Sequence, residues 1–193
     1  MRRSKMEIVS LLGSPRKKGN STQMAEIVAS ALEDKGNRVT RYFLNSLDFR
    51  GCQACGACKD KSEICILKDD LTPVLDAVKK ADVIMMATPV YWGDISAQLK
   101  TFIDRTYSYL MPDFKEKEVK HRLPGGKKLV FIQSQGAPEE MFTELFDRYN
   151  IFFEMLNYFE ETHVLRGCEL NELGALKSRD DLVQGAMAIA EKL

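Results

Sequence analysis

Five short apolar runs alternate with amphipathic helical stretches along the 193 residues, and this order limits the possible folds more than any other feature. A short apolar run is typical of a strand buried on both faces, whereas apolar residues at every third or fourth position are typical of one helix face. The runs predicted as strands cover residues 6–12, 38–44, 82–87, 128–134 and 161–166. Their alternation with helices indicates an α/β fold with a parallel sheet and helices on both faces.

Helical patterns follow each strand and start near residues 21, 71, 95, 141 and 182. Right-handed crossovers and five strands favour the flavodoxin-like strand order 2-1-3-4-5, in which the first and third strands are neighbours. Ligands of such sheets bind outside the carboxyl ends of the strands, at the point where the strand order reverses. We therefore expect residues 1–193 to form a single domain, with a ligand on the loops that follow Leu12 and Ala87.

Composition and charge exclude several classes of protein. The chain is 45% hydrophobic and 29% charged, and 28 Lys and Arg balance 28 Asp and Glu, which argues against nucleic-acid binding. No apolar run approaches the roughly 20 residues that cross a bilayer. The apolar run near the start is too short for the core of a signal peptide. We expect a cytoplasmic protein with no nucleic-acid or membrane partner.

The loop after the first strand, residues 13–22 (GSPRKKGNST), is rich in hydrogen-bond donors and leads into a helix. Free backbone N–H groups and the positive end of the helix dipole favour an anion there. The loop has neither the G-x-G-x-x-G fingerprint nor the Walker A lysine. A phosphomonoester is the expected ligand, and a simple helix cap with solvated basic residues is the alternative. The residues predicted to bind the phosphate are Ser14, Arg16, Asn20, Ser21 and Thr22.

The loop after the third strand holds the only Trp of the chain between a Pro and a Gly. The aromatic side chains of such a loop can stack on a flat aromatic ligand, and its backbone N–H groups can bind the ring heteroatoms. The alternative is that Tyr91 and Trp92 are core or interface anchors. The small loop after the fourth strand lies at the same edge, where an ordinary turn is the alternative. The residues predicted to line the ligand are Pro89, Val90, Tyr91, Trp92, Gly93, Gln135 and Gly136.

Together these loops resemble the NADPH-dependent FMN reductase family of flavodoxin-like proteins. The motifs that carry the resemblance are GSPRKKGNST, TPVYWGDISAQLKTFIDR and, more loosely, QSQGA. The resemblance implies non-covalent FMN, with its phosphate on the first loop and its isoalloxazine along the third. It implies an oxidoreductase that passes electrons from NAD(P)H, or from a reduced carrier, to a quinone, flavin, nitro or azo compound or oxygen. No catalytic side chain is expected, because the flavin carries the chemistry.

Four of the five cysteines lie within fourteen residues of a loop predicted at 51–70. Such clustering in a cytosolic chain indicates metal or redox chemistry more often than disulfides. The C-x2-C-x2-C run suits an iron-sulfur cluster, whereas zinc sites more often use two separated C-x2-C pairs. The isolated Cys168 is expected to be a small buried residue.

The cysteine loop resembles that of iron-sulfur flavoproteins, which implies a 4Fe–4S cluster. Its ligands would be Cys52, Cys55, Cys58 and Cys65. The gap of six residues before Cys65 is longer than is usual in that branch. The alternative is FMN alone, with the thiols free, oxidised or packed beneath the flavin.

Two other functions are compatible with the pattern. A flavodoxin-type electron carrier without a cluster is disfavoured by the zero net charge, because such carriers are often acidic. A receiver-type regulator needs acidic residues after the first strand, where this chain has Gly13 and Ser14.

A small-molecule electron acceptor or a redox carrier protein is the expected partner. The long connection 107–126 is rich in apolar residues for a loop. We predict that it covers the flavin of a neighbouring subunit in a homodimer or homotetramer, and a loop packed on its own body is the alternative. The apolar residues concerned are Tyr107, Tyr109, Leu110, Met111 and Phe114.

Overall fold

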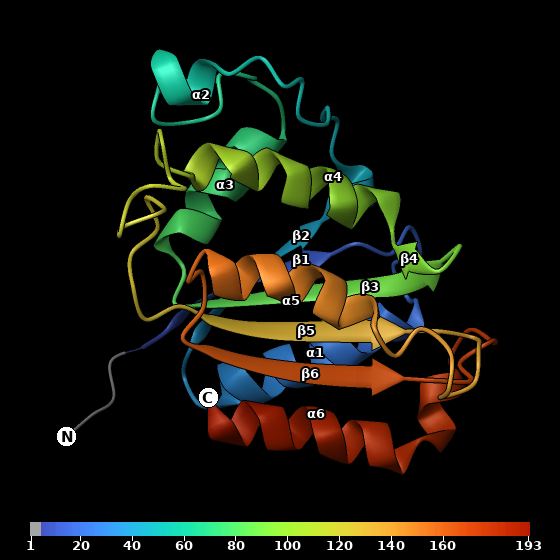
Figure 1. Cartoon of the computed structure of the whole chain (residues 1–193). Helices are drawn as coiled ribbons and strands as arrows, with labels where there is room; N and C mark the ends of the chain where they lie inside the picture. The colour runs from blue at the N-terminus through green and yellow to red at the C-terminus, as the bar shows by residue number, and fades with distance from the viewer. Residues whose placement is uncertain (1–4) are drawn as a thin grey trace.

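The computed structural model describes residues 5–193 and shows a parallel sheet with helices on both faces (Figure 1). The strands are β1 (Glu7–Leu12), β2 (Arg38–Phe43), β3 (Val83–Tyr91), β4 (Asp94–Ile95), β5 (Lys128–Ser134) and β6 (Glu161–Gly167). The longer helices are α1 (Asn20–Asp34), α3 (Leu71–Lys80), α4 (Ala97–Arg105), α5 (Leu145–Met155) and α6 (Asp180–Lys192). The short helical turns are η1 (Leu44–Ser46), α2 (Ala57–Asp60), η2 (Thr106–Tyr109) and η3 (Ala175–Ser178).

The sheet has the order β2-β1-β3-β5-β6, and all of these neighbours are parallel. The predicted flavodoxin-like order is therefore confirmed. The two-residue strand β4 was not predicted; it pairs antiparallel with the end of β3, so that Val90 faces Ile95. Trp92 and Gly93 form the turn between them, with φ angles of 51° and 74°. The loop at the switch point is thus a small hairpin rather than an open loop.

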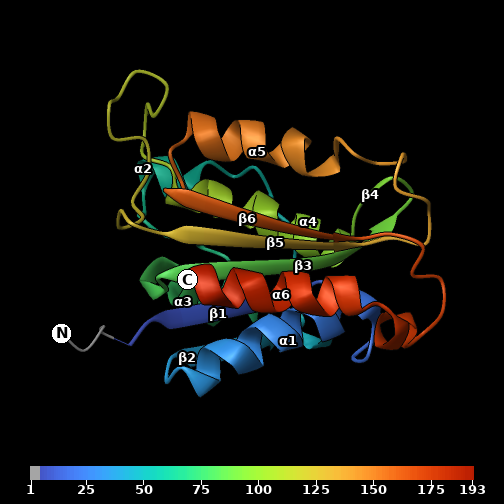
Figure 2. The same cartoon turned by 90° about the horizontal axis from the view of Figure 1, so that it is seen from below.

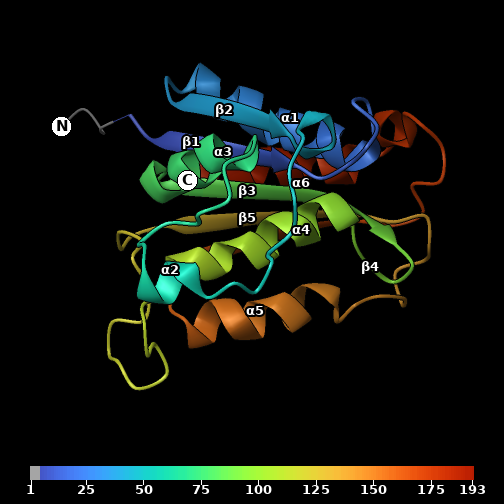
Figure 3. The ribbon, with the colours of Figure 1, turned by 90° about the horizontal axis from the view of Figure 1, so that it is seen from above.

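Alternate residues of β3 point to opposite faces of the sheet and into two separate cores. Ile84 and Met86 pack with the apolar sides of α3, α4 and α5, which cover the face seen in Figure 3. Val83, Met85 and Ala87 pack with α1 and α6, which lie in front of the sheet in Figure 2. This explains why the third strand is apolar almost throughout. Within residues 5–193, no helix is long and apolar enough to cross a membrane.

The helix boundaries differ from the predictions mainly at α5. Predicted to start near residue 141, it begins at Leu145, because the preceding residues form a loop held by the Gln135 side chain. That amide donates to the carbonyls of Pro138 at 2.8 Å and Met141 at 2.9 Å. The helix ends at Met155, shortly before Asn157 adopts a left-handed φ of 53° that breaks the helical path.

Alanine at Gly13 should lower the free energy of unfolding by about 1 to 3 kcal/mol, the usual range for overpacking a core. Gly13 donates its N–H to the Ala87 carbonyl at 2.8 Å. An added Cβ would lie 3.1 Å from that carbonyl oxygen and 2.7 Å from the Ser96 hydroxyl. Urea denaturation measures the effect. Gly125→Ala is the control, since its Cβ would approach only Glu160, at 3.7 Å; equal losses in both variants would contradict the prediction.

Candidate functional site

The predicted ligand loops meet at the carboxyl edge of the sheet, on the right in Figure 1. They enclose a cavity of about 240 Å³. The predicted residues that line it are Ser14, Arg16, Asn20, Ser21, Pro89, Val90, Tyr91, Gln135 and Gly136. Three others, Thr22, Trp92 and Gly93, lie outside this lining. The structure therefore brings together the first, third and fourth predicted loops, as expected for a switch point.

The start of α1 has hydrogen-bond donors that the protein itself does not use. Its capping residue, Gly19, provides no side-chain hydrogen bond to the first turn. Among residues 5–193 the buried hydroxyls of Ser21 and Thr22 have no hydrogen-bond partner, and Ser21 lines the cavity. A Cβ on Gly19 would lie 2.7 Å from the Ser14 hydroxyl, so any side chain there would crowd the loop. Unused donors at an uncapped helix start fit a phosphate group, and no metal is needed to explain them.

The amides of Asn20 and Gln135 are largely used by the protein itself. Asn20 donates through Nδ2 to the carbonyls of Leu170 at 3.1 Å and Glu172 at 3.0 Å. Gln135 is 3% exposed, donates to the loop before α5, and accepts from Gln133 at 2.8 Å. Both side chains hold loops around the cavity in place, and their role as direct ligands stays a prediction.

The β3–β4 hairpin presents aromatic surface next to the cavity. The Tyr91 side chain is 44% exposed and that of Trp92 is fully exposed, so neither is a core anchor in this chain. The hairpin is fixed from behind, because Arg148 donates to the Gly93 carbonyl at 2.7 Å and the Tyr149 hydroxyl donates to Asp94 at 2.7 Å. Burial and the Asp94 carboxylate raise the pKa of Tyr149 well above its usual value, so this hydroxyl stays a donor.

Sequence reasoning missed the loop after β6 as part of the site. Leu170, Asn171 and Leu173 also line the cavity. The backbone N–H of Leu170 donates to the Gln135 carbonyl at 2.9 Å, which joins this loop to the one after β5. The usable signal was the rule that every strand contributes its carboxyl end to one edge. By this rule the loop after the strand at 161–166 belongs to the same edge.

The four clustered cysteines line a second cavity of about 500 Å³ beside the C-terminal half of α4. All five cysteines are free; Cys52 and Cys55 are exposed, Cys58 and Cys65 are half-buried, and Cys168 is buried as predicted. Within residues 5–193, no three Cys, His, Asp or Glu side chains are grouped tightly enough to hold one metal ion. A 4Fe–4S cluster binds each thiolate to a different iron, so its ligands are spread around a larger space than those of one ion. The donor type and the shared cavity therefore fit a cluster better than a single zinc ion.

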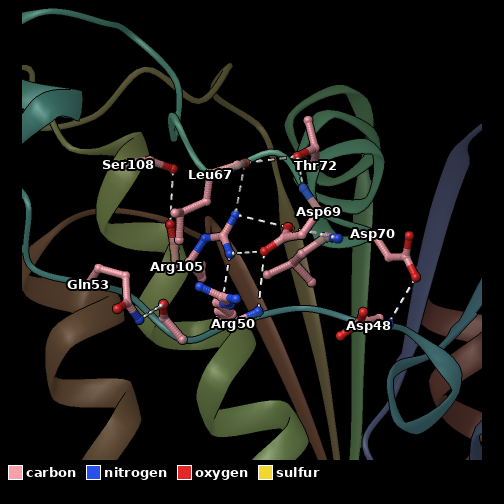
Figure 4. A network of polar contacts seen from close by, with 11 residues as sticks. Asp48, Arg50, Gln53, Leu67, Asp69, Asp70, Thr72, Arg105 and Ser108 are labelled. Atoms are coloured by element: carbon pink, nitrogen blue, oxygen red, sulfur yellow. Dashed lines mark hydrogen bonds and ion pairs between the residues drawn. The ribbon is translucent and has the colours of Figure 1, made fainter.

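The two ends of the cysteine loop are joined at its base by a buried ion pair (Figure 4). Arg105 has a fully buried side chain and contacts Asp69 at 2.7 Å. It also donates to the carbonyls of Arg50 at 2.7 Å and Leu67 at 3.4 Å. Asp48 and Asp70 add a second tie, since each accepts from the other's backbone N–H. These contacts close the base of the cysteine loop. We call this base the neck of the loop, and it is formed by Asp48, Arg50, Leu67, Asp69, Asp70 and Arg105.

Electrostatics at this neck hold both partners in their charged forms. Burial alone would raise the pKa of Asp69, but the hydrogen bonds from Arg105 and from the Arg50 N–H lower it below its usual value. Burial also disfavours the charged form of Arg105, and the contacts with Asp69 and Cys65 outweigh it, so its pKa is raised. Sequence reasoning missed Arg105, because nothing in the α4 pattern marks it as buried.

The segment after η2 lies at the opposite edge of the sheet from the cavity of the first loop, because α4 runs antiparallel to the strands (Figure 1). Tyr109 and Leu110 are buried in the core of their own chain, so the prediction that they cover a neighbour's flavin is wrong. The Tyr109 hydroxyl donates to the Leu75 carbonyl at 2.8 Å. Tyr107 and Phe114 instead line an apolar groove of about 800 Å³ between α4 and α5.

Fold and site together define a flavodoxin-like protein in which an uncapped helix start and an aromatic hairpin meet at the switch point of the sheet. The chain belongs to the NADPH-dependent FMN reductase family, which matches residues 6–156. This confirms the family predicted from the loop motifs.

Curated relatives point to the iron-sulfur flavoprotein branch of this family. An iron-sulfur flavoprotein from Archaeoglobus fulgidus is 36% identical over 137 residues, which is 70% of this chain and 59% of the relative. One from Methanosarcina thermophila is 34% identical over 101 residues, 52% of each protein. The chain thus spans only about half to three-fifths of the length of these relatives.

Solved structures confirm the fold. An NAD(P)H:quinone oxidoreductase from Methanothermobacter marburgensis superposes with a TM-score of 0.72 at 18% identity, over 98% of this chain and 97% of the other. An FMN-dependent NADH-azoreductase from Bacillus anthracis, solved with FMN, also gives 0.72, at 12% identity over 96% and 98%.

Proposed function

We propose that the chain binds FMN at the carboxyl edge of its sheet and transfers electrons from NAD(P)H to a small-molecule acceptor such as a quinone. The observation that carries the proposal is the uncapped start of α1, where the buried Ser21 hydroxyl has no partner beside the switch-point cavity. Membership of the FMN reductase family supports the same assignment. FMN, when bound, supplies the hydride and single-electron chemistry that amino-acid side chains lack.

The chain's own residues bind and orient the cofactor. Ser14, Arg16, Ser21 and the first N–H groups of α1 hold the phosphate, and the predicted ligands Asn20 and Thr22 complete this loop. The 89–93 hairpin and the 135–136 turn line the ring. The cavity of about 240 Å³ is below the about 300 to 1,000 Å³ of common ligand pockets, so it encloses only part of the cofactor.

An anaerobic titration with FMN, followed by NAD(P)H oxidation in the presence of a quinone, tests this function. We expect the absorption spectrum of bound flavin and a rate of NAD(P)H oxidation that depends on the added quinone. Absence of FMN binding would overturn the proposal. Slow NAD(P)H oxidation with fast transfer between protein carriers would instead favour a non-enzymatic electron carrier.

The cysteine cavity is proposed to hold a 4Fe–4S cluster. Support comes from four thiols around one cavity and from the names of the relatives. The residues that would hold the cluster are Cys52, Cys55, Cys58 and Cys65. A cluster would let the protein divide two-electron flavin chemistry into single-electron transfers.

Self-association is proposed to complete the flavin site. The cavity is open, and the neighbouring Trp92 is fully exposed although it is a large aromatic side chain. The groove lined by Tyr107 and Phe114 is a second apolar surface. We expect light scattering of the FMN-loaded protein to give the mass of a dimer or tetramer, and a monomeric mass at micromolar concentration would contradict this.

Alanine at Ser21 should weaken FMN binding by about 10- to 100-fold, because a hydrogen bond to a charged group contributes about 1.5 to 3 kcal/mol. The FMN-free protein should lose no stability, since this buried hydroxyl has no partner to lose. Fluorescence titration and urea denaturation separate the two effects. Ser30→Ala, an exposed position on the same helix, is the control. Unchanged FMN affinity in Ser21→Ala would remove this hydroxyl from the phosphate site.

A further inference from the structure

Arg105 is the one buried guanidinium of the described chain that faces the cysteine cavity. Its side chain is fully buried, and the residue lines the same cavity as the four thiols. Within residues 5–193 its buried Nε has no hydrogen-bond partner, although the other two nitrogens are bonded. Because buried donors are usually hydrogen-bonded, an unpartnered donor beside a cavity indicates a bound group that accepts from it.

The contacts of Arg105 join points that are far apart in the chain. They reach the carbonyl two residues before the first clustered cysteine, at Arg50, and the carbonyl two residues after the last one, at Leu67. Asp69 binds two of its nitrogens, at 2.7 and 3.2 Å. One planar guanidinium therefore fixes both ends of the loop, which a lysine cannot do with the same geometry.

Other charged groups in the cavity wall do not offer the same arrangement. The Lys59 ammonium lies 3.3 Å from the Cys58 sulfur but already donates to the carbonyls of Tyr107 and Leu110. Asp104 is the acidic residue of the wall, and it pairs with Lys100 at 2.5 Å. Arg105 is thus the fully buried cation of this cavity, whereas Lys59 is a half-buried one.

We propose that Arg105 is the positioning residue of the cysteine cavity, and that it both closes the neck of the loop and gives the wall a positive charge that favours an anionic cluster. The charge role rests on the proposed cluster, whereas the neck role does not. A cluster held by four thiolates gains negative charge on reduction, and a nearby fixed cation favours the reduced form.

The neck is tested on the FMN-loaded, iron-free full chain by amide hydrogen exchange. In Arg105→Gln and Arg105→Lys, exchange of residues 50–69 should be about tenfold faster or more, because hydrogen bonds to a charged group are lost. Arg41→Gln, which removes a guanidinium paired with Glu26 and Glu33 elsewhere, should leave these residues unchanged. Unaltered exchange at 50–69 in both Arg105 variants would overturn the neck role.

The charge is tested by the midpoint potential after anaerobic reconstitution with iron and sulfide. Arg105→Gln should lower the potential, Arg105→Lys should keep it near the wild-type value, and Asp69→Asn should raise it. If the substitutions only loosened the loop, the midpoint potentials of Arg105→Gln and Asp69→Asn would shift in the same direction. That result would overturn the charge role. If Arg105→Gln does not fold, the other two variants still decide: the potential of Asp69→Asn should rise while that of Arg105→Lys stays near the wild type, and equal shifts in both would overturn the charge role. Failure of the wild type to take up iron would overturn the cluster and the charge role, and the exchange result would then stand for the neck alone.

Discussion

Asparagine at Asp69 should lower the free energy of unfolding at pH 7 by about 3 kcal/mol, the lower end of what breaking a buried ion pair costs. The carboxylate is 14% exposed and its partner Arg105 is fully buried, so the substitution leaves a positive charge without its counterion in the protein. The amide oxygen of asparagine keeps one acceptor, which is why the loss lies at the lower end. Urea denaturation of the FMN-free protein measures it.

The effect at Asp69 should depend on pH in a defined direction. Because its folded-state pKa is lowered from the ordinary value of 3.8, the stabilisation is complete above that value. It is lost as the pH falls through the lowered folded pKa, so the wild type and the variant should converge in acid. Asp181→Asn is the matched control, since Asp181 also forms a two-point pair with an arginine but is 59% exposed. Its stability should be nearly unchanged, and equal losses in both variants would contradict the argument.

Most of the fold could be predicted because local patterns determined it. The five apolar runs became the five parallel strands, and Gly36 follows α1 with a left-handed φ of 86°, a common way for a helix to end. The order of the strands followed from crossover rules rather than from any single residue. These rules also placed the first and third loops together, and the cavity found there confirms that placement.

The differences from the predictions came from side chains whose hydrogen-bond partners no local pattern marks. Arg105 pairs with Asp69 across 36 residues, and neither position differs in sequence from an exposed charged residue on a helix or loop. The Gln135 amide delays the start of α5, although the apolar pattern before it is helical. In both cases side-chain hydrogen bonds override the local signal, and a single sequence does not show them.

Serine at Cys52, Cys55, Cys58 or Cys65 should abolish the stable iron content of the reconstituted protein, from about four irons per chain in the wild type to almost none. All four line one cavity, and a serine hydroxyl binds iron far more weakly than a thiolate. Cys168→Ser is the control, because Cys168 is buried away from this cavity. FMN content should stay unchanged in every variant, since the flavin cavity contains no cysteine.

Iron and acid-labile sulfide assays on the same anaerobic samples distinguish the remaining outcomes. Equal iron and sulfide, lost in all four variants, would support the complete four-cysteine site. Loss in three variants but retention in Cys65→Ser would show that the longer gap before this residue places it outside the ligand set. One zinc ion per chain without sulfide would replace the cluster by a structural metal site. A protein with FMN but neither metal would leave the four thiols as redox-active or packing groups, and electron transfer would then be confined to the flavin.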